Sequence, residues 1–173
     1  TASEEEIMAL TKLGEQQGQI DEEENTLIQK VFLLDDIDAR DIMTPISRAD
    51  TVEAEAPLDS LKEWVQTLTH SRIPVYSGSI DNITGIVHTR DLMLALANDQ
   101  MKRTVADFMQ PATFVPMSMT TIALLNHLRR EKAHLAIVVN AEGTVLGLVT
   151  LEDAIEELIG EIEDENDPLE TTS

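Results

Sequence analysis

A heptapeptide occurs twice in this chain and constrains its fold more than any other feature. Residues 85–91 read GIVHTRD, and residues 147–153, 62 positions later, read GLVTLED. Each copy has a glycine, two aliphatic residues, polar positions and an aspartate where a helix is expected to begin. A repeat of this period predicts two similar units that pack together, because neither unit alone can bury its apolar face.

The repeat extends to the N-terminal side of each heptapeptide. Residues 41–45 (DIMTP) match residues 107–111 (DFMQP), 66 positions apart, and residues 71–76 match residues 133–138. The offset therefore falls from 66 to 62, and the first copy holds four extra residues between these two landmarks.

Apolar periodicity and turn residues predict the same element order, β-α-β-β-α, in both units. In the first unit we expect extended residues at 51–52, a helix over 57–70, strands at 73–76 and 83–87, and a helix over 89–97. In the second unit the matching segments are 114–115, 120–131, 135–139, 145–149 and 151–159. The strands are continuous apolar runs, which indicates sheets covered on both faces. The predicted fold is α/β, with the two units packed sheet to sheet in pseudo-two-fold symmetry.

Two helices are predicted before the repeats. The first covers residues 4–17, and the second begins after Asp21, which forms a capping box with Glu24 and precedes an apolar stripe at helical spacing. The predicted organisation has four parts: an acidic helical segment at 1–39, repeat units at 40–100 and 101–161, and an acidic tail at 162–173. The tail is expected to fray after Glu161.

The net charge of −21 is concentrated near the two ends of the chain. Residues 1–40 carry 11 acidic and 3 basic side chains, and residues 150–173 carry 10 acidic side chains and no basic one. No basic stripe is present, so nucleic acid is excluded as a partner. No apolar run approaches the roughly 18 residues of a membrane-spanning helix, and no signal peptide is present. Because the chain starts at Thr1 without methionine, we expect a soluble piece of a longer protein.

Catalytic and metal-binding patterns are not found in the sequence. Cysteine is absent, which excludes disulfides and thiolate chemistry, and the four histidines lack metal-ligand spacing. We therefore predict that the chain is not an enzyme and holds no tightly bound structural metal. Asp164 and Asp167 have oxygen atoms suitable for a divalent cation, but a solvated tail explains them more simply.

Thr150 and Asp153 suggest a binding site at the start of the last helix. The N-terminus of a helix offers amide groups and positive potential to a phosphate, and the threonine hydroxyl can join them. An aspartate one turn later can accept both hydroxyls of a ribose, as an acidic residue does in Rossmann folds. The same two residues also fit an ordinary capping box, which stabilises the helix by about 0.5–2 kcal/mol and binds nothing. Spacing alone leaves both interpretations open.

Two β-α-β-β-α repeats that open with Met-x-Pro and close with the heptapeptide resemble a tandem CBS pair, or Bateman module. The resemblance covers residues 40–160. The flanking segments GQIDEEENTLIQKVFLLDDIDARDIMTP and GLVTLEDAIEELIGEIEDEND are similar to the CorC/HlyC family of magnesium and cobalt transport-associated proteins.

The resemblance implies an adenine nucleotide ligand, AMP, ADP or ATP, with magnesium where the ligand is ATP. The residues that it implies for nucleotide binding are Thr150, Asp153, Tyr76, Pro74, Arg72 and Ile46. The adenine ring is expected among Ile46, Pro74 and Tyr76, and a phosphate near Arg72. Core packing of Tyr76 and an ion pair of Arg72 are the competing interpretations. Further candidates for phosphate contact are His70, His134 and Lys132.

A second nucleotide site is implied in the first repeat at His88 and Asp91, where histidine replaces the threonine. The family implies a homodimer, a membrane domain before this chain, a small domain after it, and a location at the cytoplasmic face of the inner or plasma membrane. The predicted function is a regulatory nucleotide-binding module of a protein linked to magnesium or cobalt transport. The alternative is a nucleotide-free structural or dimerisation unit, or an acidic interaction domain that senses magnesium.

Overall fold

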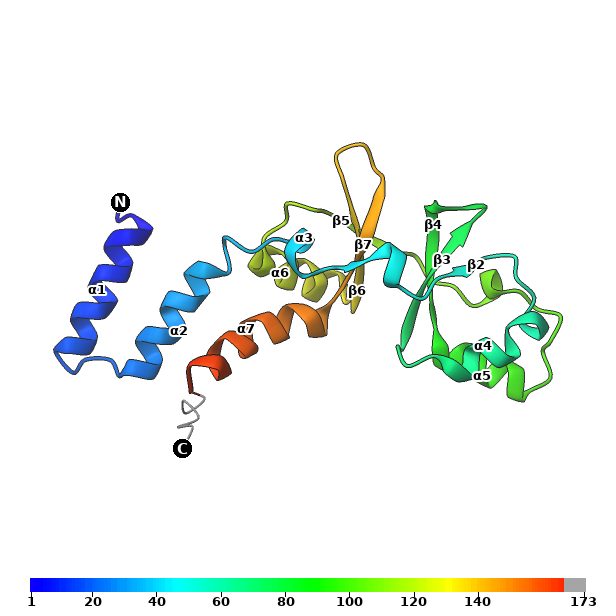
Figure 1. Cartoon of the computed structure of the whole chain (residues 1–173), viewed down its shortest axis with the longest axis horizontal. Helices are drawn as coiled ribbons and strands as arrows, with labels where there is room; N and C mark the ends of the chain where they lie inside the picture. The colour runs from blue at the N-terminus through cyan, green and yellow to red at the C-terminus, as the bar shows by residue number, and fades with distance from the viewer. Residues whose placement is uncertain (167–173) are drawn as a thin grey trace, which may run out of the picture.

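Two sheets, one for each repeat, face each other at the centre of the molecule (Figure 1). The computed structural model describes residues 1–166, with side chains for 1–160. One sheet has the order β2–β3–β4, with strands Val52–Glu53, Arg72–Ser77 and Ser79–His88. The other has the order β1–β7–β6–β5, with strands Thr44–Pro45, Val145–Thr150, Leu135–Val139 and Thr113–Pro116. A cluster of aliphatic residues from β4, β6 and β7 joins the sheets, as the sequence predicts.

Helices cover the outer face of each sheet. The first repeat has a 3₁₀ helix, η2 (Leu58–Leu61), and helices α4 (Lys62–Thr67) and α5 (Thr89–Ala97). The second has α6 (Thr121–Glu131) and α7 (Leu151–Asn166). Two further 3₁₀ turns, η1 (Ile46–Arg48) and η3 (Val105–Asp107), lie near the start of each repeat. Each sheet and its helices enclose a separate aliphatic core, so the predicted β-α-β-β-α order is confirmed in both units.

The helix predicted over 57–70 is shorter in the structure. Its first turn is the 3₁₀ helix η2, and α4 ends at Thr67. The amide groups of Leu58 and Asp59 donate to the carbonyls of Arg103 and Met101, 2.9 and 3.0 Å away. This contact with the linker between the repeats is long-range, so it is not visible in the local pattern.

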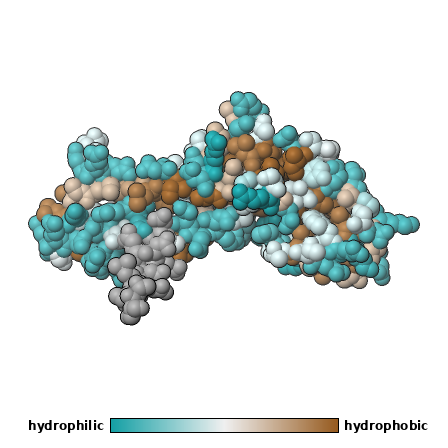
Figure 2. Space-filling model, in the orientation of Figure 1, coloured by the Kyte–Doolittle hydropathy of each residue, from teal (hydrophilic) through white to brown (hydrophobic). Residues whose placement is uncertain are grey.

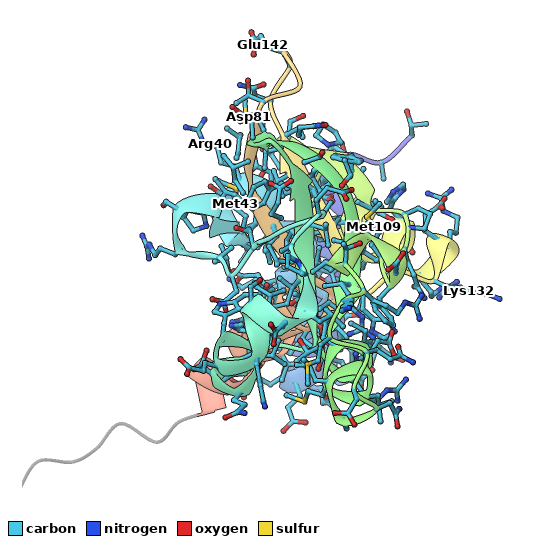
Figure 3. All side chains as sticks on the ribbon, turned by 90° about the vertical axis from the view of Figure 1, so that its right-hand side faces the viewer. Arg40, Met43, Asp81, Met109, Lys132 and Glu142 are labelled. Carbon is cyan, nitrogen blue, oxygen red and sulfur yellow. The ribbon has the colours of Figure 1, made fainter. Side chains whose placement is uncertain are left out.

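The segment that opens each repeat packs on the sheet of the other repeat. Strand β1, which opens the first repeat, pairs with β7 of the second, with Pro45 opposite Gly147. The corresponding Gln110 bridges to Ile86 on β4 of the first repeat. Figure 3 shows Met43 and Met109 on opposite sides of the central sheets, below the hairpin tips marked by Asp81 and Glu142. The exchange ties the two units together, in agreement with the prediction that neither is self-sufficient.

The repeated glycines make this exchange sterically feasible. A Cβ atom at Gly147 would lie 2.3 Å from the carbonyl oxygen of Thr44, and one at Gly85 would lie 2.6 Å from that of Gln110. Real Cβ atoms do not approach backbone oxygens so closely. Glycine has no Cβ atom, so it permits this close backbone approach in both copies of the heptapeptide.

The N-terminal helices are α1 (Glu4–Gln16), α2 (Glu22–Leu33) and the short α3 (Ala39–Ile42). The predicted capping box at the start of α2 is present, since Asp21 and Glu24 exchange side-chain to backbone hydrogen bonds of 2.8 and 3.4 Å. Helix α7 packs beside α2 and continues to Asn166. The predicted fraying after Glu161 is therefore wrong for residues 162–166. The rest of the predicted tail lies outside the described residues. None of the described helices combines the length and apolarity needed to cross a bilayer.

Candidate functional site

A cavity of about 390 Å³ lies at the junction of the two repeats. Four chain segments contribute to its wall. They are residues 44 and 48–50 from β1 and the end of η1, residues 69–73 at the start of β3, residues 134–135 at the start of β6, and residues 148, 150, 152 and 153 at the junction of β7 and α7. Both repeats and the exchanged segment therefore contribute to one site. Its volume is in the range of small-molecule pockets, roughly 300–1,000 Å³.

Thr150 and Asp153 lie together on this wall and form a reciprocal capping box. The Thr150 amide donates to Asp153 Oδ2 and the Asp153 amide donates to Thr150 Oγ1, both at 3.1 Å. The capping interpretation is thus realised. It leaves Asp153 Oδ1 without a hydrogen bond to any described residue, and the Thr150 hydroxyl proton still available to a ligand. Capping and ligand binding are compatible.

The amide groups at the start of α7 are less available to phosphate than the sequence predicts. The amide of Leu151 donates to the carbonyl of His134 at 2.9 Å, and that of Asp153 is held by Thr150. These hydrogen bonds satisfy two donors that an isolated helix N-terminus would offer to an anion. Any phosphate in the cavity must therefore find its main positive partners among the side chains.

Two guanidinium groups supply that charge. Arg48, at the end of η1, and Arg72, at the start of β3, line the cavity, and neither forms an ion pair within the part of the chain that the structure describes. The alternative of an ion pair for Arg72 is therefore not realised. An arginine fork is well suited to phosphate because its donors match two oxygens at once.

His70 and His134, predicted as further phosphate partners, also line the cavity, whereas Lys132 does not. His134 Nδ1 lies 4.0 Å from Glu152 Oε1, and both side chains are well exposed. The two histidines come from different repeats, so the structure brings together donors that are 64 positions apart in the sequence.

Ile46, Pro74 and Tyr76 are not on the cavity wall. Ile46 and Tyr76 pack in the aliphatic cluster between the two sheets, and Pro74 is buried in β3. The core-packing interpretation of Tyr76 therefore agrees with its position. The apolar part of the wall consists of Ala49, Ile73, Leu135 and Leu148.

The first-repeat counterparts of the motif lie elsewhere. His88 caps α5, since its Nδ1 atom accepts a 3.3 Å hydrogen bond from the amide of Arg90. Asp91 is half-buried in the first turn of α5, and neither residue lines the cavity. A second site at these residues stays a prediction.

Arg48 and Asp50 belong to the cavity wall but were not singled out by the sequence. They lie a few residues after the Met-x-Pro turn, in a segment that carries no motif of its own. Their only signal is their proximity to Ile46, which the family resemblance places near a ligand. Among the described residues no group of three or more acidic or histidine side chains is arranged to hold a metal ion. Asp164 and Asp167 lie outside the described side chains.

Comparison with known proteins identifies the family to which this chain belongs. A family model for the CBS domain matches residues 39–98 and 105–160. The magnesium and cobalt efflux protein CorC of Pasteurella multocida is 36% identical over 163 residues, which is 94% of this chain and 54% of the relative. The chain spans 26–56% of the length of the first curated relatives that it matches.

Two solved structures are similar over most of the chain. The CBS domain of a bacterial CNNM/CorC family Mg²⁺ transporter is 40% identical with a TM-score of 0.81, covering 92% of this chain and 98% of that one. A structure of such a domain in complex with ATP is 41% identical with a TM-score of 0.73, covering 79% of this chain and 97% of that one. The fold is that of a tandem CBS module. The chain belongs to the CBS domain family and, within it, to the CorC/HlyC family.

Proposed function

We propose that the cavity at the repeat junction binds an adenine nucleotide, with ATP as the principal ligand. The observation that carries this proposal is one cavity that combines two guanidinium groups, Arg48 and Arg72, with the carboxylate of Asp153. Neither guanidinium group has an ion-pair partner among the described residues. This pairing of cationic and acidic groups fits a ligand that has both phosphates and sugar hydroxyls. The ATP complex of a CBS domain 41% identical to this chain supports the assignment.

Each part of the nucleotide has a chemical partner on the wall. Asp153 Oδ1 accepts hydrogen bonds from the ribose hydroxyls, while the capping box fixes the carboxylate in position. Arg48 and Arg72 bind the phosphates, and the exposed imidazoles of His70 and His134 lie on the same wall. The adenine ring packs against aliphatic side chains rather than stacking on Tyr76.

A magnesium ion belongs to this proposal as part of the ligand. The wall carries three carboxylates, Asp50, Glu152 and Asp153, which repel a free triphosphate. A bound Mg²⁺ neutralises part of the phosphate charge and lowers this repulsion. We therefore expect MgATP to bind more tightly than metal-free ATP.

The position of the cavity suggests how binding is transmitted. The ligand contacts both repeats, so occupancy favours one arrangement of the module to the extent of its differential affinity. Helix α7 starts at the cavity and packs against α2, which links the site to the N-terminal helices. In the longer protein we propose a regulatory module at the cytoplasmic face of the membrane, in a homodimer that controls magnesium or cobalt transport.

A thermal unfolding titration with AMP, ADP and ATP, each with and without MgCl₂, tests the proposal. ATP at 100 times its Kd is expected to stabilise the chain by about 2.7 kcal/mol. For a chain of this size, that raises Tm by roughly 5–10 °C. Stabilisation by MgCl₂ alone, with no response to millimolar nucleotide, would instead support the magnesium-sensing alternative.

The two arginines give a second prediction. Arg48→Ala and Arg72→Ala are each expected to weaken ATP binding by about tenfold or more, because charge-assisted hydrogen bonds contribute about 1.5–3 kcal/mol. The affinity for AMP is expected to fall less, because AMP has one phosphate and therefore makes fewer contacts with the two arginines than ATP does. Arg90→Ala, an exposed arginine on α5 outside the cavity, is the matched control and should leave both Kd values unchanged. Equal effects of all three substitutions would contradict the assigned phosphate position.

A further inference from the structure

The second N-terminal helix buries polar side chains and exposes apolar ones. On α2, Asn25 and Lys30 are 7% and 5% exposed, whereas Leu27, Val31 and Leu33 are 43%, 40% and 50% exposed. A helix that packs only within its own chain normally turns its apolar side inward and its polar side toward water. Asn25 hydrogen-bonds to Glu15 of α1, so its burial follows from the packing of α2 against α1. Ile28 and Phe32 are partly buried, whereas Leu27 and Val31 form a further apolar side that is exposed. This exposed side indicates that another molecular surface covers α2.

Helix α1 extends the same exposed surface. It has no buried residue, and Ile7, Leu10 and Leu13 along one side are 37%, 62% and 46% exposed. Helices α1 and α2 pack against each other, and Figure 2 shows apolar surface running from α1 across α2. We call five of the exposed apolar side chains on these two helices the apolar band: Ile7, Leu10, Leu13, Leu27 and Val31. Contiguous apolar surface of this kind marks interaction sites.

The charge around the apolar band selects its partner. Both helices begin with three glutamates, at 4–6 and 22–24. Residues 1–40 carry 11 acidic and 3 basic side chains, and one of the three bases, Lys30, is buried. A second copy of this face would place carboxylates against carboxylates, which costs free energy and slows association. The complementary surface is apolar with a cationic border.

We propose that the apolar band docks an amphipathic α-helix whose apolar side is flanked by lysine or arginine. Such a helix places side chains at i, i+3, i+4 and i+7 on the band, as in other helix-recognition surfaces. Its flanking cations then lie over the glutamates at the starts of α1 and α2. This function is separate from the nucleotide cavity, whose wall contains no residue of α1 or α2.

A pair of synthetic helical peptides provides the test. Each has about 18 residues with leucine on one side; one peptide carries lysine beside the leucines, and the other carries glutamate at the same positions. Titration of the 1–173 chain into the labelled peptides, followed by fluorescence anisotropy, is expected to show micromolar binding of the lysine peptide only. High salt should weaken this binding, because the flanking charges are exposed.

Variants of the chain locate the binding surface. The double substitution Leu10→Gln and Val31→Gln is expected to weaken binding of the lysine peptide at least tenfold. Leu94→Gln, at a 54% exposed leucine on α5 outside the apolar band, is the matched control and should not change the Kd. Because all three side chains are exposed, far-UV circular dichroism and Tm should show each variant folded as the parent chain.

Three results would overturn the proposal. The first is equal binding of both peptides, or of neither, which removes the role of charge or of the surface itself. The second is an equal loss of binding in the Leu94→Gln control. The third is a dimer of the free chain in sedimentation equilibrium that is lost in the band variant, since the covering surface is then a second copy.

Discussion

Gly147→Ala is expected to reduce the free energy of unfolding by about 2–4 kcal/mol, with a fall in Tm of roughly 5–15 °C. The added methyl group would lie 2.3 Å from the carbonyl oxygen of Thr44 and 2.9 Å from the sulfur of Met43. The oxygen belongs to β1, whose pairing with β7 places Thr44 opposite Leu148. Relief of the clash therefore requires β1 to separate from the sheet of the second repeat.

Two further glycine variants sharpen this test. Gly160→Ala lies within α7, where the new Cβ would be 3.5 Å from Glu156 Oε1, an ordinary contact. It is expected to raise stability by about 0.5–1 kcal/mol, as alanine does in a helix interior. Gly85→Ala should destabilise like Gly147→Ala, because its Cβ would lie 2.6 Å from the Gln110 carbonyl. An unchanged Tm for Gly147→Ala in differential scanning calorimetry would show that β1 does not pack on β7 as described.

Asp153→Ala is expected to remove most of the stabilisation by ATP. Loss of charge-assisted hydrogen bonds to the ribose, worth roughly 3 kcal/mol, weakens binding about 100-fold. At an ATP concentration of 100 times the original Kd, the stabilisation then falls from about 2.7 to about 0.4 kcal/mol. Thermal unfolding with and without ATP measures both values.

Controls separate this effect from loss of the helix cap. Asp153→Ala also removes the hydrogen bond to the Thr150 amide, so the ligand-free chain should lose about 0.5–2 kcal/mol. Glu24→Ala removes the corresponding bond at the start of α2 and should not alter the ATP response. Asp91→Ala tests the equivalent position of the first repeat and should also retain it. A reduced response in Asp91→Ala would move a nucleotide site into the first repeat.

Helices and strands are predicted well where the apolar periodicity of the segment itself determines its secondary structure. The helix over 89–97 and the strand over 135–139 have the predicted bounds. The predicted capping box at Asp21 is present because it depends on residues three positions apart. The helix over 57–70 was too long because the carbonyls of Met101 and Arg103 hold its first turn.

Contacts between the repeats were less predictable. Sequence alone does not show that the Thr44 carbonyl, from the segment that opens the first repeat, lies against Gly147 in the second repeat. The pairing of β1 with β7 also brings Arg48 to the cavity. Tyr76 packs in the core between the two sheets. Thr150 and Asp153 are recognisable in the sequence because they lie three positions apart, the spacing of a capping box at the start of a helix. Cavity residues without a motif become recognisable only once the two units are packed together.

Isothermal titration calorimetry of MgATP into the 1–173 chain tests the central claim most directly. One saturable site per chain is expected, with weaker binding in the absence of magnesium and about 100-fold weaker binding in Asp153→Ala. Wild-type affinity in Asp153→Ala would place the nucleotide outside the cavity at the repeat junction. The absence of binding heat at millimolar MgATP, together with an unchanged Tm, would contradict nucleotide binding by this chain.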